Sequence, residues 1–110
     1  MLVTFKSKAS GDVIMFGDVA HRMMEIMGKE AGGQGIVTVE KLPEAIALLK
    51  AAAAADREAK RSLKEEDLPQ LEAAADGSQR PFVSLSQRAT PLIELLERSL
   101  KKQVPVVWGV

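Results

Sequence analysis

The sequence contains no cysteine and only one histidine, and both shortages limit the chemistry open to the chain. Without cysteine there is no disulfide, no thiolate metal ligand and no cysteine nucleophile. With His21 alone, a metal site built on two imidazoles is excluded. No Gly-x-Ser-x-Gly segment is present to hold an activated serine. We therefore expect no cofactor and no metal ion, identify no catalytic residue, and favour a non-catalytic role over an enzymatic one.

Neither sign of charge dominates, and no long apolar run occurs. The 15 Lys and Arg residues balance the 15 Asp and Glu residues, so the formal net charge is zero. No stretch has the dense cationic character that neutralises phosphates, so we expect no nucleic-acid partner. The longest apolar block, Ala51–Ala55, is far below the roughly 20 residues that cross a bilayer, and the N-terminus lacks the features of a signal peptide. These observations predict a cytoplasmic protein with no membrane partner.

Apolar residues make up 46% of the chain and are spread along its whole length, which favours a folded protein over a disordered one. A chain of 110 residues has the usual size of one domain with one core. We therefore expect residues 1–110 to form a single domain.

Three short segments are rich in β-branched or aromatic residues and predict strands. They are Leu2–Phe5 with its continuation into Lys6–Lys8, Ile36–Val39 after a glycine-rich loop, and Val104–Trp108. Pro105 has no N–H to donate, so it limits the last strand to a sheet edge or to a strand start. The single Trp108 is expected in the core.

Four segments show helical spacing of apolar residues or helix-start signals. We expect helices between the cap Ser10 and the stop Gly28, from Pro43 to about Arg61, from Asp67 to Gly77, and from Thr90-Pro91 to Lys102. A start near Ser86 is the alternative for the last helix, but it places Pro91 beyond the first turn, where the missing N–H and the ring are costly. The predicted fold is α+β, with the N- and C-terminal strands in a small two- or three-stranded sheet that packs against about four helices.

Helical spacing also brings the single imidazole close to two carboxylates. Asp18 lies three residues before His21 and Glu25 lies four residues after it, so the three side chains share one face of the expected first helix. One imidazole with two carboxylates is a thin basis for a metal site, and a solvated histidine among surface charges is the favoured interpretation. His21 and Asp18 are nevertheless candidate ligand- or partner-binding residues.

Methionines concentrate on the same helix. Flexible thioethers either fill gaps in a core or form an adaptable binding surface. Core filling is the favoured interpretation for the group, but Met15 and Met24 fall at the margins of the apolar stripe. We expect these two to stay partly exposed and regard them as candidate partner-binding residues.

The last helix supplies two further candidates, Gln87 and Arg88. Arg88 lies between apolar Leu85 and Leu92, where a planar guanidinium can hold a carboxylate or backbone carbonyl groups. A structural role that holds the preceding loop is favoured over ligand binding, and both interpretations remain open. The backbone setting of Gln87 depends on where the helix begins.

The order of several segments resembles that of a known family. These segments are Val3-Thr4-Phe5-Lys6-Ser7, Asp12-Val13-Ile14-Met15-Phe16, Gly35-Ile36 with Leu42-Pro43-Glu44-Ala45, Gln87-Arg88-Ala89 with Pro91-Leu92-Ile93-Glu94-Leu95-Leu96, and Val107-Trp108. Together they resemble the short bacterial proteins of the domain of unknown function 1840 family. The resemblance covers nearly the entire chain, with residues 56–80 the least characteristic part. It implies a bacterial cytoplasmic protein and implies no reaction, cofactor or site residue.

Two functions are compatible with these residues. The favoured expectation is a small protein-interaction module without catalytic activity. A homodimer is also expected, because the edge of a small sheet invites another chain. The alternative is a small-molecule-binding protein or an enzyme with a pocket near Arg88, which requires Arg88, Gln87, His21 and Asp18 to converge.

Overall fold

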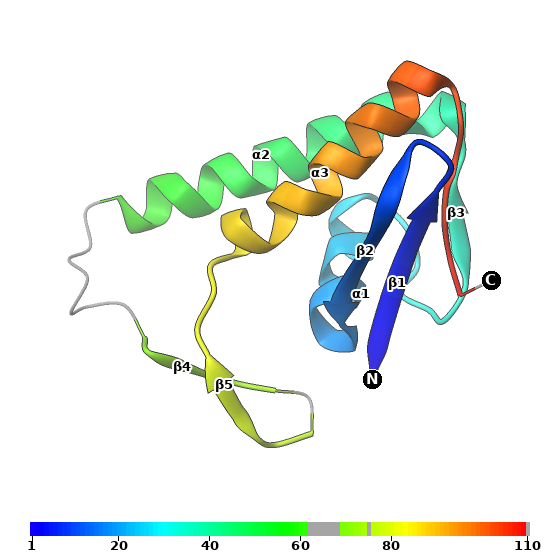
Figure 1. Cartoon of the computed structure of the whole chain (residues 1–110). Coiled ribbons are helices and arrows are strands. Elements are labelled where there is room, and N and C mark those ends of the chain that lie inside the picture. Colours follow the sequence, from blue (N-terminus) through cyan, green and yellow to red (C-terminus); the bar gives the residue numbers. More distant parts are fainter. Residues whose placement is uncertain (62–68, 75, 110) are drawn as a thin grey trace.

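The computed structural model describes residues 1–61, 69–74 and 76–109 of the chain. Within them it contains six strands, three α-helices and one short 3-10 helix (Figure 1). In chain order these are β1 (Leu2–Ser7), β2 (Ser10–Phe16), α1 (Gly17–Ile26), β3 (Gly35–Val37), η1 (Val39–Lys41), α2 (Leu42–Lys60), β4 (Leu71–Ala73), β5 (Gln79–Pro81), α3 (Leu85–Lys102) and β6 (Val106–Trp108). The predicted α+β class is confirmed.

The main sheet has four antiparallel strands in the order β2-β1-β6-β3. The N- and C-terminal strands are neighbours, as predicted, and Phe5 pairs with Trp108. The sheet is larger than expected because β1 and β2 form a hairpin. β6 lies inside the sheet between β1 and β3, so Pro105 marks a strand start and the edge position considered for it is wrong. β4 and β5 form a separate two-stranded hairpin.

The first half of the expected first helix is the strand β2. Val13 to Phe16 are consecutive apolar residues, and such a run fits a strand as well as a helix. Pairing with β1, in which Val3 lies opposite Met15, decides in favour of the strand. The helix begins only at Gly17 and ends, as predicted, next to Gly28, whose φ of 80° suits glycine.

Two further helix predictions need correction. The segment Leu71–Ala73, inside the expected third helix, is the strand β4, and the expected start at Asp67 lies outside the described residues. The last helix begins at Leu85, capped by Ser84, so Pro91 is an interior residue. The hydroxyl of Thr90 donates to the carbonyl of Ser86 at 2.9 Å, which adds a bond in the turn that the proline weakens.

Helices cover one face of the main sheet. α1 lies behind β1 and β2 in Figure 1, α3 packs on the same inner face, and α2 runs beside α3. In the core the ring of Phe5 meets the edge of Trp108 at 5.5 Å between centroids, which confirms the core position predicted for the tryptophan. Met15 and Met24 are also core residues, 8% and 0% exposed, so their predicted partial exposure is wrong. No helix in the described part of the chain is long and apolar enough to cross a membrane.

Candidate functional site

An alternating chain of four charged side chains joins the β4–β5 hairpin to the rest of the protein. Arg80 of β5 donates from Nη1 and Nη2 to the two carboxylate oxygens of Asp18 at 3.2 and 2.8 Å. Its Nε donates to Glu72 of β4 at 3.0 Å. This paired geometry fits the planar guanidinium fork and is the strongest type of ion pair that arginine forms.

Arg88 of α3 completes this ion-pair network. Its Nη2 donates to Glu72 Oε1 at 3.1 Å and its Nε donates to the carbonyl oxygen of Val83 at 3.3 Å. The backbone N–H of Val83 donates to the same carboxylate oxygen at 3.1 Å. Arg88 therefore holds both a carboxylate and a loop carbonyl, and these contacts favour the structural interpretation of its role.

The network lowers the pKa of both carboxylic acids. Hydrogen bonds from Arg80 hold the pKa of Asp18 below its ordinary value of 3.8. Burial alone would raise the pKa of Glu72, but the N–H of Val83 and the guanidinium groups of Arg80 and Arg88 lower it below 4.5. Carboxylates with depressed pKa values are weak proton acceptors near neutral pH. The arrangement is suited to holding elements together and poorly suited to general base chemistry.

The network also lies against an aromatic ring of the sheet. The guanidinium carbon of Arg80 is 4.4 Å from the centroid of the Phe16 ring, and that of Arg88 is 5.9 Å away. Cation–π contacts of this kind add to ion pairs when the cation is partly desolvated, and the side chain of Arg80 is only 10% exposed. The hairpin is therefore attached to α1, α3 and β2 together.

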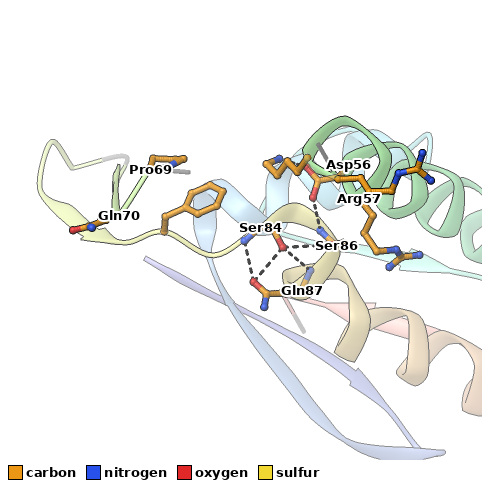
Figure 2. Close-up of a pocket in the computed structure, with 10 residues that line it drawn as sticks. Asp56, Arg57, Pro69, Gln70, Ser84, Ser86 and Gln87 are labelled. Carbon is orange, nitrogen blue, oxygen red and sulfur yellow. Dashed lines mark hydrogen bonds and ion pairs between the residues drawn. The ribbon is translucent and has the colours of Figure 1, made fainter. Parts of the chain in front are cut away.

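Gln87 lies at the start of α3 in a different cleft. The backbone N–H of Gln87 donates to Ser84 Oγ and the N–H of Ser84 donates to Gln87 Oε1, both at 3.3 Å, which is a capping box. Figure 2 shows Asp56 of α2 facing the same helix end, where its carboxylate accepts the N–H of Ser86 at 3.2 Å. The cleft has a volume of about 530 Å³.

Asp56 supplies the negative charge that this helix end prefers. Burial alone would raise the pKa of Asp56, but its ion pair with Lys60 and the N–H of Ser86 lower it. Arg57 and Arg61 add positive charge at the rim of the cleft. Because an internal carboxylate already occupies the helix start, the N–H groups there are not free for an external anion.

His21 lies in a third region, together with Asp18. Both residues line a cleft of about 520 Å³ between α1 and the β4–β5 hairpin, with Arg80 beside them. The Nε2 atom of His21 is buried and has no hydrogen-bond partner among the described residues. Glu25 is exposed, and no group of three His, Asp or Glu side chains that could hold a metal lies within 1–61, 69–74 and 76–109.

The structure thus brings together only some of the candidate residues. Asp18 is joined to Arg88 through Arg80 and Glu72, and it shares a cleft with His21, whereas Gln87 lies in the separate cleft at the start of α3. Arg80 and Glu72 were missed because Leu71–Ala73 was predicted as part of a helix and Gln79–Pro81 was not predicted as a strand. A strand-turn-strand interpretation of residues 71–81 would have placed these opposite charges on paired strands, and Glu72 does pair with Arg80.

Several apolar side chains are exposed on the outer face of the main sheet, and one of them, Phe16, is partly covered by Arg80 and Arg88. The side chains of this face alternate with the buried ones along each strand. Leu2 is 63% exposed, Ile14 60%, Phe16 45% and Ile36 43%. Leu2 lies opposite Phe16, and Thr4 lies opposite Ile14. We call these residues, with Thr4, Lys6, Asp12 and Val107, the open face.

Comparison with known protein families finds a match over nearly the whole chain. The sequence model of a family described as a domain of unknown function (DUF1840) matches residues 1–108. No curated protein and no solved structure matches the chain. The match therefore adds no substrate, partner or catalytic residue to the geometry.

Proposed function

The chain belongs to the DUF1840 family of domains of unknown function, and from its structure we propose that it is a non-catalytic protein-interaction module that binds its partner through the open face. We further propose that the protein acts in the bacterial cytoplasm, as its composition and its resemblance suggest. The proposal is carried by one observation, the exposure of Leu2, Ile14 and Phe16 side by side on two paired strands.

The size of this apolar surface supports an interface. A large apolar side chain has roughly 200 Å² of surface, so the exposed fractions of Leu2, Ile14, Phe16 and Ile36 leave on the order of 400 Å² of apolar surface on one side of the sheet. The largest apolar patch on a soluble monomer measures about 300 to 600 Å² and is often functional, so this surface has the size of a functional patch. Leu2, Ile14 and Phe16 also line a hollow of about 250 Å³ beside Arg88, which is smaller than the roughly 300 to 1,000 Å³ of most small-molecule sites, so the face fits a protein surface better than a small ligand.

The alternative, a small-molecule site near Arg88, finds less support. It needs Arg88, Gln87, His21 and Asp18 around one pocket, but these residues line separate clefts. The guanidinium of Arg88 is already bound to Glu72 and to the carbonyl of Val83. The cleft that contains His21 and Asp18 is the place for a ligand that brings two of these candidates together. A compound that raises the unfolding temperature of the intact chain and of Asp18→Asn equally would argue against binding there.

The experiment that tests the proposal compares two lysine substitutions of exposed apolar residues. Ile14→Lys places a charge in the middle of the open face, and Leu48→Lys places the same charge on α2, where Leu48 is 38% exposed. A partner is captured from bacterial lysate, identified and purified, and its affinity is then measured with each variant. Binding to the intact chain and to Leu48→Lys with loss of binding to Ile14→Lys is expected. Equal binding to both variants would reject the open face as the interface.

A further inference from the structure

The pairing of β1 with β2 allows the open face to stack on a second copy of itself. Across the β1–β2 hairpin, Leu2 lies opposite Phe16 and Thr4 lies opposite Ile14, so each pair sits at one height along the strands. Lys6 of β1 faces the part of β2 that contains Asp12, where the strand register shifts. A half-turn about an axis that lies above the open face, parallel to the strands and midway between β1 and β2, places each member of a pair over the other member in a second copy.

We propose that the open face binds a second copy of this chain about that twofold axis, with the β1–β2 hairpins of the two copies stacked face to face. This inference rests on the proposed function and names its partner. The rotation places Leu2 of one copy on Phe16 of the second copy, and Thr4 on Ile14. It also places each Lys6 on the Asp12 of the other copy. Sheets packed in this way lie about 10 Å apart, which suits interdigitated side chains.

The positions of the charged side chains favour this axis over a twofold axis between β1 and β6. An axis between β1 and β6 would place Lys6 on Val107 and Asp12 on the β3 side of the second copy, near Ile36, so two charges would face apolar side chains. Among the described residues neither Lys6 nor Asp12 forms an ion pair within the chain. Both side chains are exposed and therefore free to pair across the interface.

The area available predicts a weak dimer. Leu2, Ile14 and Phe16 expose on the order of 300 Å² of apolar surface per copy, taking roughly 200 Å² for each whole side chain. Because interfaces are about 60% apolar, the two copies together bury on the order of 1,000 Å². This value is at the low end for specific complexes. We therefore expect dissociation constants of about 10 to 100 μM.

Sedimentation velocity of the full chain from about 5 μM to about 1 mM, with small-angle scattering at the highest concentration, tests this inference. The intact protein is expected to shift from monomer to dimer across the range. Ile14→Lys is expected to weaken the dimer at least tenfold, because the twofold axis buries the new charge twice, and Leu48→Lys to change it less than about twofold. Far-UV circular dichroism and thermal unfolding confirm that each variant is folded.

Charge exchange tests the position of the axis. Lys6→Glu and Asp12→Lys are each expected to weaken the dimer about fivefold, because each places like charges opposite one another twice. The double variant restores opposite charges and is expected to return to within about twofold of the intact chain. A double variant weaker than either single one overturns the proposed axis.

The outcomes also separate this inference from the proposed function. A monomer at 1 mM overturns the dimer, and a dimer equally affected by Ile14→Lys and Leu48→Lys overturns the open face as its interface. If the chain is monomeric but a different purified protein binds it and is lost with Ile14→Lys, the proposed function stands without the dimer. If the monomer binds no such protein, both fail.

Discussion

Glu72 joins the two arginines that attach the β4–β5 hairpin, so its charge is the most informative one to remove. Glu72→Gln keeps the size of the side chain and keeps an oxygen that can accept the N–H of Val83. It removes the negative charge that lies between Arg80 and Arg88, leaving Asp18 as the only carboxylate in the described network. The substitution therefore removes the charge and one acceptor oxygen while it keeps the size of the side chain.

The expected loss follows from the burial of the partners. Glu72 is 22% exposed, Arg80 10% and Arg88 17%, so the network lies between an exposed ion pair and a buried one. Exposed pairs contribute about 0 to 1 kcal/mol, and breaking a buried pair costs about 3 to 5 kcal/mol. We expect hairpin docking to weaken by about 2 kcal/mol, which raises the population of the undocked hairpin about 30-fold.

Amide hydrogen exchange measures this population residue by residue. The N–H of Phe82 bonds to Gln70 at 2.9 Å and the N–H of Ala74 bonds to Ser78 at 2.8 Å, both within the hairpin. Because a two-stranded hairpin alone is at best marginally stable in water, undocking exposes both amides to exchange. Their protection is expected to fall about 30-fold in Glu72→Gln, while that of the buried turns of α3 changes little.

The matched control is Glu97→Gln. It removes a carboxylate that pairs with Lys50 at 2.9 Å, where the two side chains are 45% and 55% exposed. Its loss is expected to be below about 0.5 kcal/mol. If Glu72→Gln changes hairpin protection no more than the control, the network does not hold the hairpin and the reasoning is refuted.

Three further predictions concern acid, a helix cap and a close contact. Because the folded pKa values of Asp18 and Glu72 are lowered from 3.8 and 4.5, their stabilisation is full above these ordinary values and is lost as pH falls through the lowered ones. Hairpin amide shifts in NMR spectra should therefore change below about pH 4, and a change complete above pH 5 would contradict this. Ser84→Ala removes the acceptor of the capping box and should cost about 1 kcal/mol, or about 4 °C in thermal unfolding, with no change counting against the cap. Gly35→Ala would place a methyl group in the ring of Trp108 and should destabilise the fold by about 2 kcal/mol in chemical denaturation followed by tryptophan fluorescence, whereas an unchanged midpoint would show that the ring can move aside.

Helix α2 was predictable because its signals are local. Pro43 near its first turn and an apolar stripe through Ile46 and Leu49 define its start and its buried side, and the observed helix runs from Leu42 to Lys60. The capping box of α3 is also a local signal. The expected free-energy cost of a proline inside a helix nevertheless favoured a later start, at Thr90-Pro91. In the protein Pro91 is exposed and the capping box at Ser84 begins the helix six residues earlier than predicted.

The ion-pair network joins residues that are far apart in the sequence, so no short sequence pattern predicts it. Asp18 and Arg88 were identified as candidates from their surroundings in the sequence. The residues that connect them, Glu72 and Arg80, lie in a hairpin whose two strands have three residues each. Arg80 and Asp18 are 62 positions apart, so only the tertiary fold brings them to 2.8 Å. Strands of three residues carry a weak periodic signal, so the sequence did not reveal this hairpin.

The strand β2 contains a signal that bears on the open face. A sheet covered on one side by helices usually alternates apolar and polar residues, whereas a strand buried on both sides is apolar throughout. From Val13 to Phe16 the strand is continuously apolar, yet helices cover only the side of Val13 and Met15. The solvent side of α3, which includes Glu94, Glu97 and Lys101, is polar as expected for a surface that stays in water. The chain therefore keeps the solvent side of α3 polar but places large apolar side chains on the open face beside Lys6 and Asp12, and this contrast supports the proposal that the open face is covered when the protein functions.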